Sequence, residues 1–110
     1  MGRIKQFDIF WIGLDPTAGS EMAKTRPCVV VSPNELNDHL RTVIILPVTS
    51  TIKDYPFRVP CSISGKNGEI AVDQIRTVDK ARINTSKPLG HLSVVEIATL
   101  QDALNIMFCQ

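Results

Sequence analysis

The stretch from Leu14 to Ser32, LDPTAGSEMAKTRPCVVVS, decides how the rest of the chain is arranged. It is a polar connection between two apolar runs, FDIFWIGL over residues 7–14 and PCVVV over residues 27–31. Aromatic and β-branched runs predict strands, and the two X-Pro pairs that bound the connection predict turns or extended backbone. Long polar connections between strands often carry functional sites. We expect Glu21 and Arg26 to lie within reach of each other there.

Composition limits the class of protein. With 110 residues and 44% hydrophobic content, the chain is expected to form a single domain spanning residues 1–110. A net charge of +1 gives no overall case for a basic nucleic-acid-binding domain, so any such site is a local patch. We expect no signal peptide and no membrane span, and reduced cysteines in the cytoplasm, with Cys28 and Cys61 packed as small hydrophobes.

The remaining strands follow from further apolar runs, and a short helix interrupts them. Ser32, Pro33 and Glu35 have the spacing of a capping box with proline at the first helical position, so Ser32 is the expected N-cap. Pro47 predicts a bulge or an edge in its strand. We expect strands over 7–14, 29–32, 42–48, 57–63, 69–74 and, in shorter form, 76–83.

The C-terminal segment predicts an amphipathic helix over residues 94–108. Ser93 and Glu96 form a second capping box, followed by an apolar stripe of Val94, Ile97, Leu100, Leu104 and Met107. The apolar end of this helix, Ile106 to Phe108, suits packing into a core or a dimer. The predicted fold is mainly β with α: a small, strongly bent sheet or partly open barrel of mostly antiparallel strands with the two helices.

Three segments together resemble the MazF/PemK/Kid family of bacterial toxins: GSEMAKTRPCVVVSP over 19–33, PVTS over 47–50 and AVDQIRTVDKARI over 71–83. The resemblance extends over residues 7–108. It implies a small SH3-like or CcdB-like barrel and a homodimer. It also implies metal-independent, cofactor-free, sequence-specific cleavage of single-stranded RNA, chiefly messenger RNA, leaving 2′,3′-cyclic phosphate and 5′-hydroxyl ends and so stopping translation and growth.

The resemblance further implies a partner antitoxin whose flexible tail blocks the RNA groove, and operator DNA binding only through that antitoxin. Matched residue by residue, it assigns the catalytic set to Glu21, Arg26 and Thr49. Kid-like members carry an arginine where this chain has Ala71 and a histidine where it has Ser20. The acid–base chemistry proposed for that branch therefore does not transfer to this chain.

The catalytic assignment is chemically reasonable. Attack by the 2′-hydroxyl of RNA needs a base, a group that holds the phosphorane charge and a proton donor for the leaving 5′ oxygen. Glu21 suits the base if partial burial raises its pKa, Arg26 suits the phosphate, and Thr49 suits a nonbridging oxygen. The proton donor for the leaving oxygen is left open: Arg26 is a poor general acid because a guanidinium rarely gives up its proton, and a water molecule is the alternative. Judged without the resemblance, Glu21 and Arg26 read as a surface pair and Thr49 as a strand-end cap.

Other residues are candidates for RNA binding. Tyr55 and Phe57 could stack on bases, although Phe57 also suits the core. Arg76 and Arg82 could follow a phosphate backbone or simply face solvent. The full expected set is Ser20, Lys24, Ser50, Thr51, Tyr55, Phe57, Asp73, Gln74, Arg76 and Arg82. Asp73 is expected in an apolar strand, where it needs hydrogen-bond partners. Trp11 is expected in the core or a dimer interface, and His39 and His91 in structural roles.

No metal cluster is expected, because the sequence has no HExxH motif, no paired Cys/His spacing and no dense set of carboxylates. A second class of function stays open: a non-catalytic toxin of the CcdB type that acts by binding DNA gyrase. The polar set of Glu21, Arg26 and Thr49 separates the two, since a gyrase-binding protein needs neither a base nor a phosphate grip in that groove.

Overall fold

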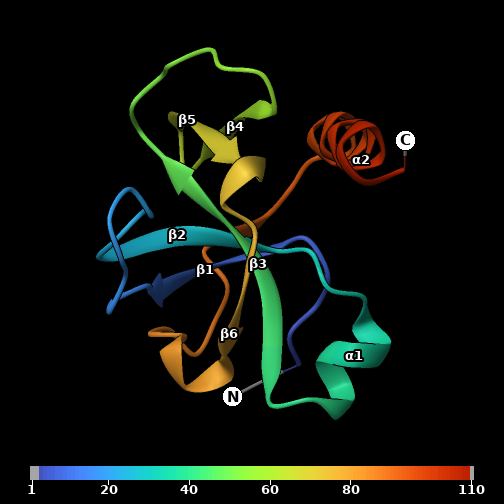
Figure 1. The fold of residues 1–110 in the computed structure, drawn as a ribbon. Helices are drawn as coiled ribbons and strands as arrows, with labels where there is room; N and C mark the ends of the chain where they lie inside the picture. Colours follow the sequence, from blue (N-terminus) through green and yellow to red (C-terminus); the bar gives the residue numbers. More distant parts are fainter. Residues whose placement is uncertain (1–2, 110) are drawn as a thin grey trace.

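The computed structural model describes residues 3–109, which form one antiparallel sheet of seven strands with two helices. The strand order is β4-β5-β3-β2-β1-β7, and β6 pairs with β3 off this path. Figure 1 shows β3 crossing the middle of the molecule, with β4 and β5 near the C-terminal helix. The strands are β1 (Asp8–Gly13), β2 (Thr25–Val30), β3 (Thr42–Thr49), β4 (Arg58–Ile63), β5 (Lys66–Ala71), β6 (Arg76–Asp79) and β7 (Gly90–His91).

The helices are α1 (Asn34–His39) and α2 (Val94–Phe108), and two single-turn 3-10 segments follow β5 and β6: η1 (Val72–Gln74) and η2 (Lys80–Arg82). The expected bent antiparallel sheet with a short and a C-terminal helix is confirmed. In the described part of the chain, none of the helices has the length and apolar character that crossing a membrane requires.

The sheet is covered on both faces, and each face has its own core. Ile45 of β3 belongs to the first core, with Phe10 and Cys28. Leu46, the next residue of β3, belongs to the second core, which α2 closes with Leu100. Side chains alternate along a strand, so a strand apolar at every position has to be covered on both sides. The bending of the sheet and the docking of α2 provide that cover.

Two cysteines pack as expected. Cys28 and Cys61 are buried and free of disulfides. Burial raises the pKa of the Cys28 thiol to about 12, against the opposing effect of Arg26 and Arg76. Burial also raises the pKa of Cys61 to about 11. Both thiols therefore stay protonated at neutral pH and act as small apolar side chains.

The boundaries of β2 and β5 differ from the sequence prediction in ways that bear on the later analysis. β2 begins at Thr25, four residues early, because β1 provides partners for it, including Trp11 for Pro27. β5 begins at Lys66 and ends at Ala71, because Ser64 and Gly65 adopt positive φ values of 51° and 80° and make a tight hairpin turn. Asp73 consequently lies in the 3-10 turn η1 rather than in an apolar strand.

Pro47 is not at a sheet edge, because β3 is a central strand and Pro47 pairs with Cys28 of β2. On its other side β3 changes partner: Ile45 is the last residue paired with β6, and Val48 is the first paired with β5. Pro47 lies in the interval between these two ladders. A residue without a backbone N–H is tolerated at such an interruption.

The prediction that Ser32 caps α1 is wrong. The N-cap is Pro33, and no side-chain hydrogen bond caps the helix. The buried Ser32 hydroxyl instead donates to Asn37 Oδ1 and accepts the backbone N–H of Ile44 in β3. Satisfying buried polar groups between helix and sheet outweighs local capping. The short helix docks on the sheet, as expected.

The prediction for α2 holds in its boundaries and its cap. Ser93 Oγ accepts the N–H of Glu96, and the Glu96 carboxylate accepts the N–H groups of Ser93 and of Ser62 in β4. Burial raises the pKa of Glu96, but these hydrogen bonds outweigh burial and lower it overall.

The apolar stripe of α2 is only partly as predicted. Leu100 is buried, and Ile97, Leu104 and Met107 pack against the second core. Val94 is 84% exposed, because at 3.6 residues per turn it lies about 120° around the helix from Leu100. Of residues 106–108 at the helix end, only Met107 contacts the core, whereas Ile106 and Phe108 are exposed, and the predicted dimer packing of this end stays a prediction.

At Gly68, β5 approaches β3 so closely that there is no room for a side chain. A Cβ at Gly68 would lie 2.9 Å from the Thr49 carbonyl oxygen, whereas a Cβ at Gly90 meets nothing within 4 Å. We expect Gly68→Ala to lower the free energy of unfolding by about 1–3 kcal/mol, and Gly90→Ala to change it by less than about 0.5 kcal/mol. Urea denaturation measures both, and equal effects would contradict the close approach.

Candidate functional site

Three polar residues form a row across the ends of β2, β3 and β5. Cys28 pairs with Pro47, so Arg26, two residues before Cys28, and Thr49, two residues after Pro47, lie on the same face of neighbouring strands. Thr49 in turn pairs with Glu69 of β5. Directly opposed residues share a face of a sheet, so Glu69 lies on the other side of Thr49. We call Arg26, Thr49 and Glu69 the polar row.

Arg26 is held by its own loop and leaves most of its donors available. Its Nε donates to the carbonyl oxygen of Ala23 at 3.0 Å. Within residues 3–109 the two terminal nitrogens have no hydrogen-bond partner. These nitrogens carry four N–H donors in a fixed plane, which is the geometry that grips a phosphate or carboxylate with two parallel bonds.

Thr49 is buried, and its hydroxyl is oriented by the backbone. Thr49 Oγ1 accepts the N–H of Thr51 at 3.1 Å. With that acceptor position filled, the hydroxyl hydrogen is free to donate to an oxygen beside Arg26. Arg26 and Thr49 therefore come together as the sequence predicted, with two kinds of donor at adjacent strand ends.

Glu21 differs from the expectation. The side chain is exposed, so the partial burial that would suit it to act as a base is not present. Its Oε1 accepts the N–H of Ala18 at 2.6 Å, within the loop between β1 and β2. No ion pair joins Glu21 to Arg26 in the described part of the chain.

The loop that carries Glu21 is fixed at both ends from other elements. Met22 donates its backbone N–H to Gln74 Oε1 of η1 at 3.2 Å. Arg76 donates to the carbonyl oxygen of Leu14 at 3.1 Å, and Arg82 donates to the carbonyl oxygens of Gly13 and Asp15. Gln74, Arg76 and Arg82 thus support the loop, and their contact with RNA stays a prediction.

A second charged group lies on the face of the polar row. Arg58 pairs with Ala71 in the ladder of β4 and β5, two residues from the pair of Pro60 and Glu69. Arg58 Nε donates to Asp73 Oδ1 at 2.8 Å, and its guanidinium stacks over the Tyr55 ring at 5.3 Å.

This pair shifts both pKa values. The hydrogen bond from Arg58 holds the pKa of Asp73 below its usual value and outweighs burial, which acts in the opposite direction. The hydrogen bond to Asp73 raises the pKa of Arg58 in turn. Asp73 is thus an ionised acceptor already engaged by the protein. Asp73 therefore has the hydrogen-bond partner that we predicted it would need.

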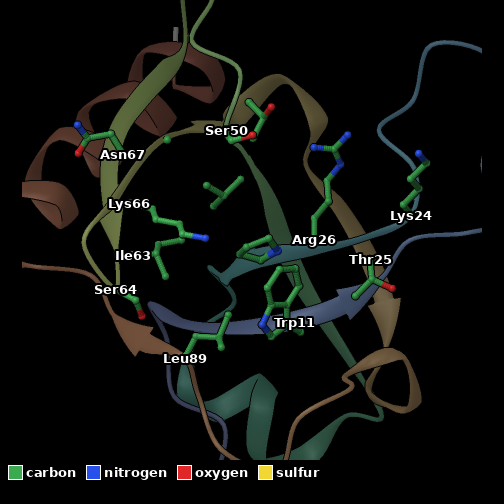
Figure 2. A pocket seen from close by; sticks show the side chains of 14 residues that line it. Trp11, Lys24, Thr25, Arg26, Ser50, Ile63, Ser64, Lys66, Asn67 and Leu89 are labelled. Carbon is green, nitrogen blue, oxygen red and sulfur yellow. The ribbon is translucent and has the colours of Figure 1, made fainter.

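The same strand ends border an apolar cavity of about 520 Å³, and Arg26 and Thr49 of the polar row belong to its lining. Trp11 and Pro27 pair with each other and form its floor, with Val48, Ile63 and Leu89 among the walls. Figure 2 shows Trp11 near the middle, Lys24 and Arg26 on one side, and Lys66 and Asn67 on the other. Trp11 is 39% exposed, so the core is the wrong one of its two predicted places, and the dimer interface stays a prediction.

The other predicted residues divide between surface and core. Phe57 packs against the second core, which is the alternative left open for it. The remaining members of the expected RNA-binding set are exposed: Ser20, Lys24, Ser50, Thr51 and Tyr55. His91 contacts Asp8 Oδ1 at 2.9 Å, and His39 contacts the Glu35 carbonyl oxygen at 2.7 Å, so both make structural contacts as expected.

Sequence reasoning missed Glu69, Arg58 and the cavity residues Lys66 and Asn67. An alternating strand gave no signal for Glu69 or Arg58, since each reads as an ordinary solvent-facing position. The pairing of β5 with β3 is what brings Glu69 beside Thr49. Over the described residues no group of three or more His, Cys, Asp and Glu side chains could hold a metal ion.

Comparisons with known proteins agree on one family. Residues 5–108 match the family model described as PemK-like, MazF-like toxin of type II toxin-antitoxin system. The endoribonuclease toxin MazF of Escherichia coli strain K12 is 34% identical over 101 residues, covering 91% of this chain and 89% of that protein. The endoribonuclease MazF9 of Mycobacterium tuberculosis is 33% identical over 113 residues, covering 94% of each.

Solved structures agree as well. MazF of Deinococcus radiodurans superposes with a TM-score of 0.87 at 25% identity and covers 100% of both chains. A MazE–MazF structure from the same organism gives a TM-score of 0.81 at 25% identity, covering 100% of this chain and 99% of that chain. The predicted barrel fold and the predicted family resemblance are both confirmed.

The pair of Arg58 and Asp73 predicts a pH-dependent contribution to stability. The folded pKa of Asp73 lies below its usual 3.8, so the contribution is present above that pH and is lost as the pH falls through the folded pKa. Asp73 has a side chain 42% exposed, which limits the effect to about 1 kcal/mol or less.

We therefore expect Asp73→Asn to be less stable than wild type at neutral pH, with the difference shrinking as the pH falls below the usual 3.8 of the carboxyl. Urea denaturation at each pH measures it. Arg58→Gln should show the same convergence, and adding Asp73→Asn to it should cost little more. A difference that stays constant down to pH 2 would contradict the pairing.

Proposed function

The chain belongs to the family of PemK-like, MazF-like toxins of type II toxin–antitoxin systems and is an endoribonuclease toxin, and we propose that it cuts single-stranded RNA, chiefly messenger RNA, at the polar row. The proposal includes sequence-specific cleavage without a metal ion and the consequent arrest of translation and growth. The observation that carries it is the juxtaposition of Arg26 and Thr49, which have unused donors, lie at adjacent strand ends and line one cavity.

The proposed reaction uses the RNA's own 2′-hydroxyl. The 2′ oxygen forms a bond to phosphorus, the bond to the 5′ oxygen breaks, and the products carry a 2′,3′-cyclic phosphate and a 5′-hydroxyl. Arg26 and Thr49 donate to the nonbridging oxygens, where negative charge develops, and such donors act most strongly when they are fixed before reaction. The Glu21 carboxylate takes the 2′ proton, and a water molecule supplies the proton of the 5′-hydroxyl.

The position of Glu21 sets a condition on this mechanism. Its hydrogen bond from Ala18 occupies Oε1, and within residues 3–109 nothing engages Oε2. The bound RNA therefore has to pass between the β1–β2 loop and the polar row. The exposed side chains of Ser20, Lys24, Ser50, Thr51 and Tyr55 line that course and are the proposed RNA contacts, with Gln74, Arg76 and Arg82 supporting the loop.

The proposed partners follow from the same family. MazE–MazF structures from Deinococcus radiodurans match this chain, which supports an antitoxin as its inhibitor. We propose that the antitoxin's flexible tail covers the RNA groove, that operator DNA is bound only through the antitoxin, and that the toxin acts in the cytoplasm as a homodimer. The endoribonuclease relatives give no support to the alternative of a gyrase-binding toxin.

Metal-free cleavage is tested directly with purified protein free of antitoxin. We expect discrete cuts at a repeated short sequence when a long single-stranded RNA is incubated with the protein and EDTA, with primer extension locating the ends. Ligation assays should show a 5′-hydroxyl at every cut. Cleavage that EDTA abolishes and Mg²⁺ restores would contradict the mechanism.

Substitutions test the polar row. Arg26→Ala and Thr49→Ala should each lower kcat by about 10²–10³-fold, the range for removing a fixed donor from a developing oxyanion. Glu21→Ala should lower it by about 10²-fold or more, the usual contribution of a general base. The matched control is Arg3→Ala, which removes an exposed arginine paired with Asp38. Near-normal cleavage by Arg26→Ala, with circular dichroism showing a folded protein, would disprove the site.

A further inference from the structure

We propose that Glu69 is a positioning residue: its buried carboxylate fixes the β3–β4 loop (residues 50–57) and thereby sets which RNA sequences are cut. This inference rests on the proposed function, since it concerns the selectivity of the same site. Glu69 is 3% exposed, and in the described residues it has no ion-pair partner within bonding distance. A buried carboxylate without an ion pair needs hydrogen bonds to be stable.

The hydrogen bonds come from the loop itself. Glu69 Oε1 accepts the backbone N–H of Lys53 at 3.0 Å, and Oε2 accepts that of Asp54 at 3.1 Å. Both carboxylate oxygens thus bind successive amides at the tip of one loop. Asp54 has a positive φ of 54°, a conformation that a non-glycine residue adopts only when its surroundings hold it.

The burial of Glu69 is itself a consequence of the loop. Ile70, the neighbouring residue in β5, faces the second core, so Glu69 faces away from that core. Side chains on that face would be exposed if nothing lay over them, as Asn67 is near the start of β5. Residues 50–57 fold back over Glu69 and cover it.

The loop has fixed backbone and free side chains. Its backbone is tied by Glu69 at the tip, by the bond from Thr51 N–H to Thr49 Oγ1 at one end, and by the bond from Arg58 N–H to the Tyr55 carbonyl oxygen at the other. The side chains of Ile52 and Tyr55 are 58% and 54% exposed. A rigid loop that presents large side chains to solvent is suited to recognising a ligand, since little entropy is lost on binding.

Glu69 is also the direct neighbour of a proposed catalytic residue. Thr49 pairs with Glu69 across β3 and β5, and the loop begins at the residue after Thr49. The carboxylate therefore sets the distance between the phosphate-binding end of β3 and the exposed side chains of the loop. That distance determines which bases can reach the loop while a phosphate sits at Arg26 and Thr49.

The test compares Glu69→Gln with a matched control. Glutamine keeps the shape but turns an N–H₂ group toward one of the two loop amides, so one hydrogen bond is lost. The control is Glu96→Gln, because Glu96 likewise accepts two backbone N–H groups, but from Ser62 and Ser93 and not from the β3–β4 loop. Each change removes one hydrogen bond between a carboxylate and a backbone N–H, and only Glu69→Gln should alter selectivity.

Two measurements are made on wild type and both variants. The first is kcat/KM on short RNAs that carry the wild-type cleavage sequence or a single-base change in it. We expect Glu69→Gln to lower the ratio between the two by about tenfold, as for loss of one buried hydrogen bond, mostly through KM, and Glu96→Gln to leave it unchanged. The second is amide hydrogen exchange of Lys53 and Asp54, which should speed up in Glu69→Gln alone.

An unchanged ratio in Glu69→Gln, unchanged exchange at Lys53 and Asp54, or the same loss of selectivity in Glu96→Gln would each overturn this inference. If the wild-type protein cuts no RNA, the proposed function fails and the inference with it. The wild-type activity distinguishes that outcome from failure of the inference alone.

Discussion

The structure depends on one constraint, which is that strand β3 is apolar on both faces. Val43 and Ile45 belong to one core, and Leu46 and Val48 belong to the other. Covering both sides of so short a sheet requires it to bend, to pair β3 with three strands and to dock the C-terminal helix over the second core. Interior positions are then filled by apolar groups, including two cysteines, and polar chemistry is confined to the strand ends and the loops beyond them.

The proposed site occupies those strand ends. Arg26 and Thr49 lie where β2 and β3 leave the cores, and the two loops that flank them are each held from elsewhere in the chain. The β1–β2 loop is bound by Gln74, Arg76 and Arg82, and the β3–β4 loop is bound by Glu69. These hydrogen bonds make both loops rigid, although neither loop has an apolar core of its own. Fixed donors and fixed loops are what the stabilisation of developing charge at such a site relies on.

The chain also shows how a family pattern can change locally. The position at which Kid-like relatives are expected to carry arginine holds Ala71, and directly opposite it on β4 stands Arg58, whose guanidinium binds Asp73. A cation is therefore present near Asp73 although it comes from a different strand. Because it is hydrogen-bonded to Asp73 and stacked on Tyr55, it organises the edge of the site and carries no assignment as an acid.

The sequence by itself determined the elements whose signals are local. The boundaries of α2, its capping box at Ser93, and the apolar runs of the strands all rely on neighbours along the chain. Arg26 and Thr49 were proposed through the family resemblance of their motifs. Local signals failed where distant groups competed for the same atoms. Ser32, for example, binds Asn37 and Ile44 rather than capping α1. Only the tertiary structure decided that Glu69 lies beside Thr49 and that Arg58 meets Asp73, because strand register and loop packing join residues that are far apart in sequence.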